Sequence, residues 1–241
     1  KAGFKNYFGM EEYNNDSDFD GTWGIYDGPF LNFFLNNLNN DKKPFFSTFF
    51  SLSSHPPYSL PKDYIKKYPI NKNENIGIRE TIFYSDYCMQ NFFEKAKDKK
   101  WFKNTIFIIT ADHSSPISYN KRYKNLIGRY AIPLVIFSGD SSLQGINNNI
   151  VQHIDIMPTV LELINYNDSY FAFGKSMFTE SWAVNFLQNK YRLITDSLII
   201  INKEEKYEFF SDWNTSIKKK EDYKYTLLLK AIKQNYNNRM I

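Results

Sequence analysis

Three short, nearly continuous apolar runs stand out along the first two thirds of the chain. They cover residues 44–52, 105–110 and 132–137 and are rich in Phe, Ile and Val. Runs of this length and composition are typical of strands buried on both faces of a sheet. The second run leads almost directly into Asp112 and His113. We therefore expect three strands of one sheet, with polar residues just beyond the end of one of them.

Helical spacing of apolar residues fills the segments between these runs. Residues 29–38 carry one apolar face after Asp27, which we expect to act as an N-cap, and residues 79–99 carry a longer one. A third helix is expected to begin at a cap formed by Asp155 and to end near Asn165. Helices that alternate with buried strands predict an α/β fold with a mostly parallel central sheet covered on both faces.

The pattern changes after about residue 180. Residues 191–201 and 206–213 are typical of short strands in a hairpin or meander, and residues 222–236 have the spacing of a closing helix. We expect a small antiparallel sheet with one helix packed on it. The chain is therefore predicted to divide into residues 1–180 and residues 181–241.

Composition narrows the classes of protein that the sequence can encode. The chain has 241 residues and 42% hydrophobic content, which is enough for a sizeable core. A formal net charge of +4 suits an anionic substrate or a membrane surface but is too small to indicate nucleic-acid binding. Cys88 is the only cysteine, which excludes an intrachain disulfide and a thiolate metal cluster. No run is apolar for long enough to span a bilayer.

Asp112 and His113 are the strongest candidates for chemistry. In open α/β sheets, ligands bind beyond the carboxyl ends of strands, where loops direct side chains into a shared crevice. A carboxylate and an imidazole at such a place supply two ligands for Mn²⁺, Zn²⁺ or another divalent ion. Two ligands do not complete a site, so at least one more must come from elsewhere in the fold. The alternative is that Asp112 caps a turn and His113 is an ordinary polar residue.

The other two histidines are candidates of a different kind. His55 precedes two prolines, which stiffen its loop, so it can donate to a phosphate oxygen or move a proton; the alternative is a loop residue without a role. His153 stands just ahead of Asp155, where we favour a structural or supporting role. Trp23 either shapes the mouth of a cleft or is buried beside a helix cap.

Several short sequence elements, each weak alone, form a specific combination. They are Gly3-Phe4-Lys5, Trp23-Gly24-Ile25-Tyr26-Asp27, Pro44-Phe45-Phe46, Leu52-Ser53-Ser54-His55-Pro56-Pro57-Tyr58, the run from Thr105 to His113, Ile132-Pro133-Leu134, His153-Ile154-Asp155-Ile156-Met157-Pro158-Thr159 and Phe173-Gly174-Lys175-Ser176-Met177-Phe178. In this order and at these separations they resemble the lipoteichoic acid synthase group of sulfatase-like enzymes. The resemblance covers most of the chain up to about residue 180.

The resemblance implies an alkaline-phosphatase-like α/β/α sandwich, in which residues 1–180 form the C-terminal portion of a catalytic domain. The implied activity is that of a phosphoglycerol transferase or phosphodiesterase, which acts on an anionic glycerophospholipid or glycerophosphate polymer through a covalent threonine intermediate. In that group, the residues matching Asp112 and His113 ligate one divalent ion, most often Mn²⁺, with Mg²⁺ or Zn²⁺ as alternatives. The histidine matching His55 contacts the phosphate of the glycerophosphate group.

The same resemblance places part of the active site outside this sequence. The group's glutamate ligand and threonine nucleophile precede the element at Gly3, so we expect no catalytic nucleophile in this chain and no activity from this fragment alone. A transmembrane region is also expected upstream, with the catalytic domain on the extracellular or periplasmic side of the cell membrane. Lys1 in place of an initiating Met fits a processed or truncated product.

Two other functions fit the same residues. A sulfatase that hydrolyses sulfuric esters shares the fold, and its modified cysteine or serine nucleophile would also lie upstream. A non-catalytic remnant or interaction module is the third hypothesis, in which Asp112 and His113 persist without a nucleophile. The sequence encoded ahead of Lys1 discriminates among the three.

Overall fold

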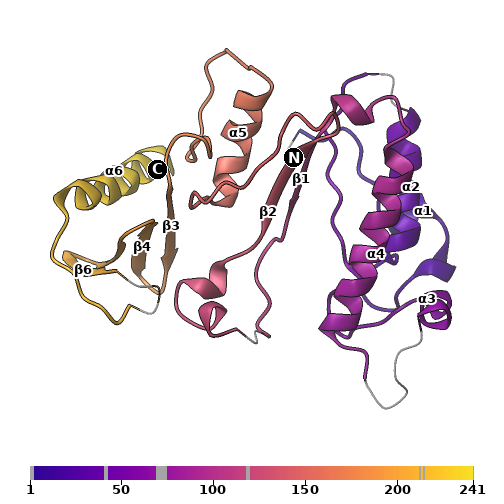
Figure 1. The fold of residues 1–241 in the computed structure, drawn as a ribbon, viewed down its shortest axis with the longest axis horizontal. Coiled ribbons are helices and arrows are strands. Elements are labelled where there is room, and N and C mark those ends of the chain that lie inside the picture. Colours follow the sequence, from indigo (N-terminus) through magenta and orange to yellow (C-terminus); the bar gives the residue numbers. More distant parts are fainter. Residues whose placement is uncertain are drawn as a thin grey trace. The chain divides into compact units, whose positions relative to one another are not determined.

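The computed structural model describes residues 3–40, 43–68, 75–117, 120–211, 213 and 215–240. The chain forms two compact units, which Figure 1 draws as ribbons. The first comprises Lys1–Phe107 with Phe137–Ser142, and the second comprises Ile108–Ile136 with Leu143–Ile241. The predicted domain boundary near residue 180 remains a prediction.

Two helices build the core of the first unit. Helices α2 (Asp27–Asn40) and α4 (Ile78–Ala96) lie side by side, which confirms the helices predicted at residues 29–38 and 79–99 (Figure 1). Their buried side chains include Leu31, Leu35, Leu38, Tyr84, Cys88, Phe92 and Ala96. These residues recur three or four positions apart, the spacing that places side chains on one face of a helix. Full burial of one such Leu or Phe contributes roughly 1.5–3 kcal/mol.

The strand predicted at residues 44–52 is wrong, because this segment has no strand structure. Phe45 and Phe49 pack against the α2–α4 core, while Phe46 and Phe50 are 78% and 63% exposed. The run is therefore buried on one side only. A strand also needs a neighbour for its N–H and C=O groups, and within the described ranges the strands pair in two sheets that do not include this segment.

Two strands predicted from the apolar runs are confirmed. Strands β1 (Ile106–Thr110) and β2 (Leu134–Ser138) pair in a two-stranded sheet. Gly139 ends β2 where the chain passes close to the backbone of Phe102: a Cβ at Gly139 would lie 1.9 Å from the Phe102 carbonyl oxygen. Only glycine fits that approach without a backbone shift.

The second unit contains a four-stranded antiparallel meander. Its strands run in sequence order, and their bounds are β3 (Trp182–Leu187), β4 (Lys190–Thr195), β5 (Ile199–Lys203) and β6 (Lys206–Phe210). Helix α6 (Tyr223–Met240) closes one face of this sheet, with fully buried Leu229 in the same apolar cluster as Leu193 and Ile200 (Figure 1). The predicted antiparallel sheet and closing helix are confirmed.

The number of strands differs from the prediction in two respects. Residues 191–201 form two strands rather than one, because Ile194 pairs with Ile199 and the chain reverses between them. The polar pair Asp196-Ser197 occupies the turn. Strand β3 was not predicted, although five of its six residues are apolar.

Short elements complete the two units. They are helices α1 (Met10–Tyr13), α3 (Lys62–Lys67) and α5 (Ile156–Leu163) and the 3-10 turns η1 (Asp16–Asp18), η2 (Phe102–Asn104), η3 (Lys121–Tyr123), η4 (Gly128–Tyr130) and η5 (His153–Asp155). Helix α5 is the helix predicted after Asp155. Of the helices in the described ranges, none combines the length and the apolar character needed to cross a membrane.

Candidate functional site

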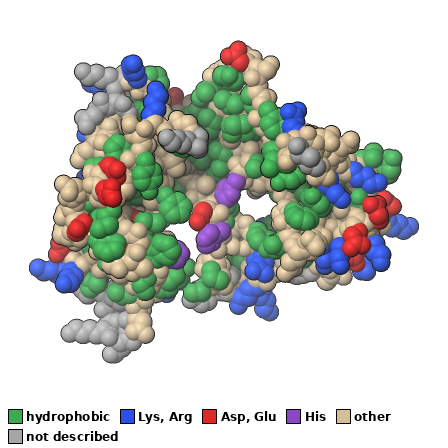
Figure 2. Space-filling model, turned by 180° about the vertical axis from the view of Figure 1, so that it is seen from behind, with side chains coloured by type: hydrophobic (Ala, Val, Ile, Leu, Met, Phe, Trp, Pro, Cys, Tyr) green, Lys and Arg blue, Asp and Glu red, His purple; other side chains and the backbone are tan. Residues whose placement is uncertain are grey.

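Asp112 and His113 lie two and three residues beyond the end of β1, in the second unit. The His113 backbone N–H donates to Asp112 Oδ1 at 2.8 Å, and His113 Nε2 lies 3.5 Å from Asp112 Oδ2. The two side chains are 72% and 55% exposed, respectively, for His113 and Asp112. Figure 2 shows histidine side chains gathered beside an acidic side chain on one face of the molecule. The structure therefore brings the two predicted ligands together at a solvent-accessible place.

The hydrogen bonds of His113 determine which ring nitrogen is available. His113 Nδ1 lies 2.9 Å from the Ser114 carbonyl oxygen, which can only accept, so we assign the proton to Nδ1. In the neutral ring, Nε2 then keeps its lone pair and lies next to the Asp112 carboxylate. Two electron-rich atoms at this separation need a proton or a cation between them.

The spacing of these two atoms fits a shared metal ion. Ligand atoms about 2.1 Å from one ion in tetrahedral geometry lie about 3.4 Å apart, and the observed Nε2 to Oδ2 distance is 3.5 Å. An imidazole nitrogen with a carboxylate oxygen is a common donor set for Zn²⁺ and for Mn²⁺. No third His, Cys, Asp or Glu joins the pair among the residues that the structure describes. Asp112 and His113 are therefore a partial donor set.

Three side chains hold the loop that carries this pair. Thr110 Oγ1 donates to the Pro133 carbonyl oxygen at 2.9 Å, and Ser114 Oγ donates to the Arg129 carbonyl oxygen. His153 Nε2 lies 2.9 Å from the Ala111 carbonyl oxygen. The loop is thus held on both sides of the pair, and the contact made by His153 agrees with the supporting role favoured for it from the sequence, although its partner Ala111 was not predicted.

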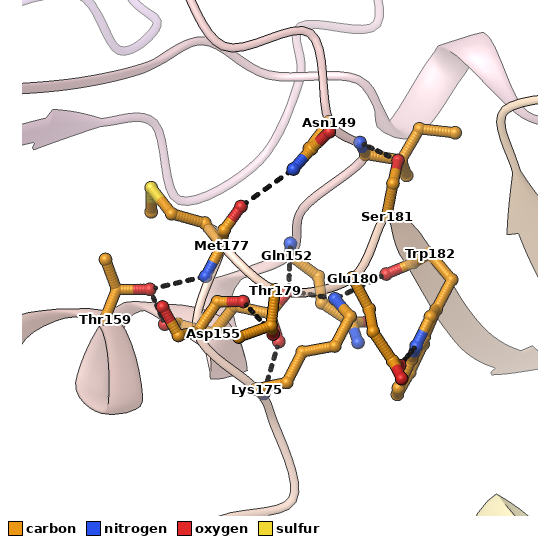
Figure 3. Close-up of polar contacts among 12 residues, drawn as sticks. Asn149, Gln152, Asp155, Thr159, Lys175, Met177, Thr179, Glu180, Ser181 and Trp182 are labelled. Carbon is orange, nitrogen blue, oxygen red and sulfur yellow. Dashed lines mark hydrogen bonds and ion pairs between the residues drawn. The ribbon is translucent and has the colours of Figure 1, made fainter. Parts of the chain in front are cut away.

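A buried ion pair fixes the segment from which His153 projects. Asp155 is fully buried, and Lys175 Nζ lies 3.3 Å from its Oδ2 (Figure 3). Asp155 also accepts from the backbone N–H groups of Lys175 and Gln152, each at 3.0 Å. We expected Asp155 to cap α5, but its carboxylate makes no capping hydrogen bond to that helix. It bonds instead to Gln152, which precedes the helix, and to Lys175, which follows it in the sequence. The negative charge of Asp155 is therefore balanced by Lys175 and not by the N-terminus of α5.

The same network joins α5 to the chain leading into β3. Thr159 Oγ1 donates to the Asp155 carbonyl oxygen at 2.6 Å and accepts from Met177 N at 3.0 Å (Figure 3). Lys175 Nζ also donates to the Trp182 carbonyl oxygen at 3.1 Å. At Gly174, a Cβ would lie 2.1 Å from the Ile154 carbonyl oxygen, so the close approach requires glycine.

His55 lies in the first unit, in an exposed turn beside Trp23. The Pro56 carbonyl oxygen accepts from Trp23 Nε1 at 2.8 Å and lies 2.9 Å from His55 Nδ1. The two rings are tilted by 58° to each other, with centroids 4.1 Å apart. A carbonyl oxygen only accepts, so we assign the proton of His55 to Nδ1, as for His113. The other ring nitrogen, Nε2, is then the one that can face a substrate. Trp23 is 51% exposed, so the interpretation that buries it beside a helix cap is wrong; its place at the mouth of a cleft stays a prediction.

A buried carboxylate holds the turn that leads to His55. Asp27 Oδ1 accepts from the backbone N–H groups of Leu52 and Ser53 at 2.9 and 3.2 Å, and Oδ2 accepts from Ser85 Oγ at 2.7 Å. Asp27 is the first residue of α2, yet its carboxylate binds a distant turn and α4 in place of the expected capping role. Buried carboxylates without a cation need several such donors.

The comparisons with known proteins place the chain in a family. The family model described as Sulfatase matches residues 1–166. The chain belongs to the sulfatase family. Among solved structures, this sulfatase-family chain is similar to a protein of the alkaline phosphatase superfamily from Vibrio parahaemolyticus, with a TM-score of 0.72 and 24% identity over 94% of this chain and 59% of that one. That likeness confirms the predicted fold class.

Curated relatives of the sulfatase-family chain carry one recurrent name. It is 26% identical over 192 residues to lipoteichoic acid synthase 1 of Bacillus subtilis (strain 168), a match that covers 74% of this chain and 30% of the relative. It is 25% identical over 198 residues to lipoteichoic acid synthase of Staphylococcus aureus (strain USA300), covering 72% and 30%. The chain thus spans about 30% of the length of these relatives. The resemblance stated from the sequence is confirmed at this level.

Proposed function

We propose that this chain is part of a metal-dependent phosphoglycerol transferase or phosphodiesterase that acts on an anionic glycerophospholipid or glycerophosphate polymer. The observation that carries the proposal is the pairing of His113 Nε2 with Asp112 Oδ2 at 3.5 Å in an exposed loop after a strand. The names of the curated relatives support the substrate class.

Asp112 and His113 would hold a divalent ion, for which Mn²⁺ is our first assignment and Mg²⁺ or Zn²⁺ the alternatives. When bound, such an ion stabilises negative charge on phosphoryl oxygens and lowers the pKa of an oxygen nucleophile. The backbone N–H of His113 keeps the Asp112 carboxylate oriented through Oδ1, so Oδ2 is free to serve as the ligand. The Ser114 carbonyl oxygen fixes the ring of His113 in the tautomer that offers Nε2.

His55 would contact the phosphate of the substrate. Its Nδ1 proton is used in the bond to the Pro56 carbonyl oxygen, so a hydrogen bond from Nε2 to phosphate requires a proton on both ring nitrogens. The resulting imidazolium is a charge-assisted donor, which suits a phosphodiester anion. Trp23 keeps the ring in place by packing against it and by donating to the same acceptor, the Pro56 carbonyl oxygen.

The nucleophile belongs to a different part of the proposed enzyme. We assign it to a threonine in a segment that precedes this chain, which attacks phosphorus and carries the phosphoglycerol group until an acceptor hydroxyl or water takes it. We also propose a membrane region in that segment, with the catalytic domain outside the cell membrane. Both assignments rest on the lipoteichoic acid synthase relatives.

A sulfatase is the second candidate function. The description of the matching family model favours it, and an exposed cation site would serve a sulfate ester as well as a phosphodiester. A hydrogen bond from His55 would suit either anion, so this residue does not discriminate between them.

The two functions are separated by assaying the full-length protein on phosphatidylglycerol and on an aryl sulfate, with and without added Mn²⁺. We expect release of diacylglycerol from phosphatidylglycerol that depends on Mn²⁺, and no sulfate release. Sulfate release without lipid cleavage would reverse the assignment. Failure to turn over either ester under all metal conditions would favour a non-catalytic module.

A further inference from the structure

The carbonyl oxygen of Ala111 has a hydrogen-bond partner from a distant part of the sequence. Strand β1 ends at Thr110, one residue before Ala111. His153 Nε2, 42 positions further along the chain, lies 2.9 Å from this oxygen. A carbonyl oxygen only accepts, so we assign the proton to His153 Nε2 and the donor role to His153. Thr110 Oγ1 also approaches Ala111 O, at 3.3 Å, but its shorter bond at 2.9 Å goes to Pro133.

This single bond restrains the residue that follows. The peptide group between Ala111 and Asp112 is planar, so its oxygen, its nitrogen and the Cα of Asp112 move as one body. A donor that holds the oxygen therefore also limits rotation at the atom from which the Asp112 side chain departs. Asp112 Oδ1 is bonded in turn to the His113 backbone N–H at 2.8 Å. The bond from His153 thus restrains the orientation of both Asp112 and His113.

His153 is suited to this task because its own backbone is fixed. It begins η5, and the last residue of that turn is the fully buried Asp155. Asp155 accepts from Gln152 N, which directly precedes His153, and from Lys175. Thr110 bonds more closely to Pro133 than to Ala111, and Ser114 bonds to Arg129, so His153 makes the shorter of the two side-chain bonds to the Ala111 carbonyl oxygen.

We propose that His153 is a positioning residue, which orients Asp112 and His113 for cation binding by donating to the Ala111 carbonyl oxygen. The inference rests on the proposed function, because orientation of the pair matters only if the pair binds a cation. It assigns no ligand role to His153, since its Nε2 is engaged with the carbonyl oxygen.

The test is the dissociation constant for Mn²⁺ of the metal-free full-length protein, measured by calorimetry without substrate. His153→Ala removes the donor, and His153→Gln replaces it with a side-chain amide N–H. We expect the alanine variant to bind Mn²⁺ about tenfold more weakly and the glutamine variant to recover most of that loss. Ile154→Ala, at the exposed neighbouring position, is the matched control and should bind like wild type.

Thermal melting of the same metal-free variants separates positioning from general stability. The alanine and glutamine variants should melt within a few degrees of each other, so that affinity and stability diverge. Wild-type affinity in the alanine variant, or equal weakening in both variants, would overturn the positioning role while leaving the metal site intact. Absence of Mn²⁺ binding in wild type would instead refute the metal site, and this inference with it.

Discussion

His113 Nε2 faces Asp112 Oδ2 at 3.5 Å, and the opposite ring nitrogen of His113 contacts the Ser114 carbonyl oxygen at 2.9 Å. The contact with Ser114 determines which ring nitrogen faces Asp112 without a proton. With the proton held at Nδ1, the neutral ring offers a lone pair to whatever lies between Nε2 and the carboxylate. Two facing acceptors are unfavourable, so either a proton on Nε2 or a cation between the two atoms would stabilise the arrangement, and the proposed metal ion is the second of these.

Removal of either member of this pair should abolish metal-dependent turnover. We expect Asp112→Ala and His113→Ala in the full-length protein to weaken Mn²⁺ binding by at least about tenfold. Both side chains are more than half exposed, so neither change creates a cavity, and the free energy of unfolding should stay close to wild type. Calorimetry for binding and urea denaturation for stability check the two statements. Wild-type turnover in either variant would contradict the ligand assignment.

Substitution of His55 should reduce turnover without changing metal affinity. His55→Ala removes a donor to an anionic group, which is worth about tenfold to a hundredfold in turnover. Trp23→Phe keeps a ring beside His55 but loses the Nε1 bond to Pro56, so its effect should be smaller, about threefold. Steady-state kinetics on phosphatidylglycerol and Mn²⁺ calorimetry give the comparison. If Mn²⁺ affinity falls in step with turnover, His55 does not act on the phosphate.

Breaking the ion pair between Asp155 and Lys175 should destabilise the second unit. Lys175→Met leaves a fully buried carboxylate without its cation, which should cost about 3 kcal/mol of unfolding free energy. The double variant with Asp155→Asn should recover part of that loss, because no charge then remains buried. Lys218→Met is the control: its pair with Glu208 is exposed, and its loss should change stability little. Equal effects of Lys175→Met and Lys218→Met would refute this account.

Cys88 should be unreactive in the folded protein. Burial between α2 and α4 raises the pKa of its thiol to about 12, whereas an unfolded cysteine has a pKa near 8.5. The thiolate is the reactive species, so at pH 8 the native thiol is neutral as well as inaccessible. Maleimide labelling at pH 8 should be slow and should accelerate only as denaturant unfolds the chain. Rapid labelling of native protein would mean that this helix pair is open in solution.

Local sequence patterns predicted the elements whose partners are close in sequence. The helices α2, α4 and α6 follow from apolar spacing alone, and β1 and β2 from short apolar runs. Residues 44–52 show the limit of such patterns: an apolar run does not reveal whether a neighbouring strand exists to pair with it. The chain reversal between Ile194 and Ile199 was also missed, because only two polar residues interrupt the apolar run at that turn.

The candidate site was predictable in its residues but only partly in its geometry. Asp112 and His113 are adjacent in sequence and follow a recognisable strand, so their pairing could be anticipated. The bond from His153 to Ala111 joins residues 42 positions apart, and the Asp155 to Lys175 pair spans 20 positions. Contacts of this kind depend on how the elements pack against one another. Local patterns in a single sequence do not reveal that packing.

The most direct test of the cation site is a crystal structure of the full-length protein grown with Mn²⁺, with diffraction data collected at a wavelength where manganese scatters anomalously. We expect one anomalous peak within about 2.0–2.3 Å of both Asp112 Oδ2 and His113 Nε2. A peak coordinated by other residues, with Asp112 and His113 both pointing away from it, would show that these two residues are not the metal ligands.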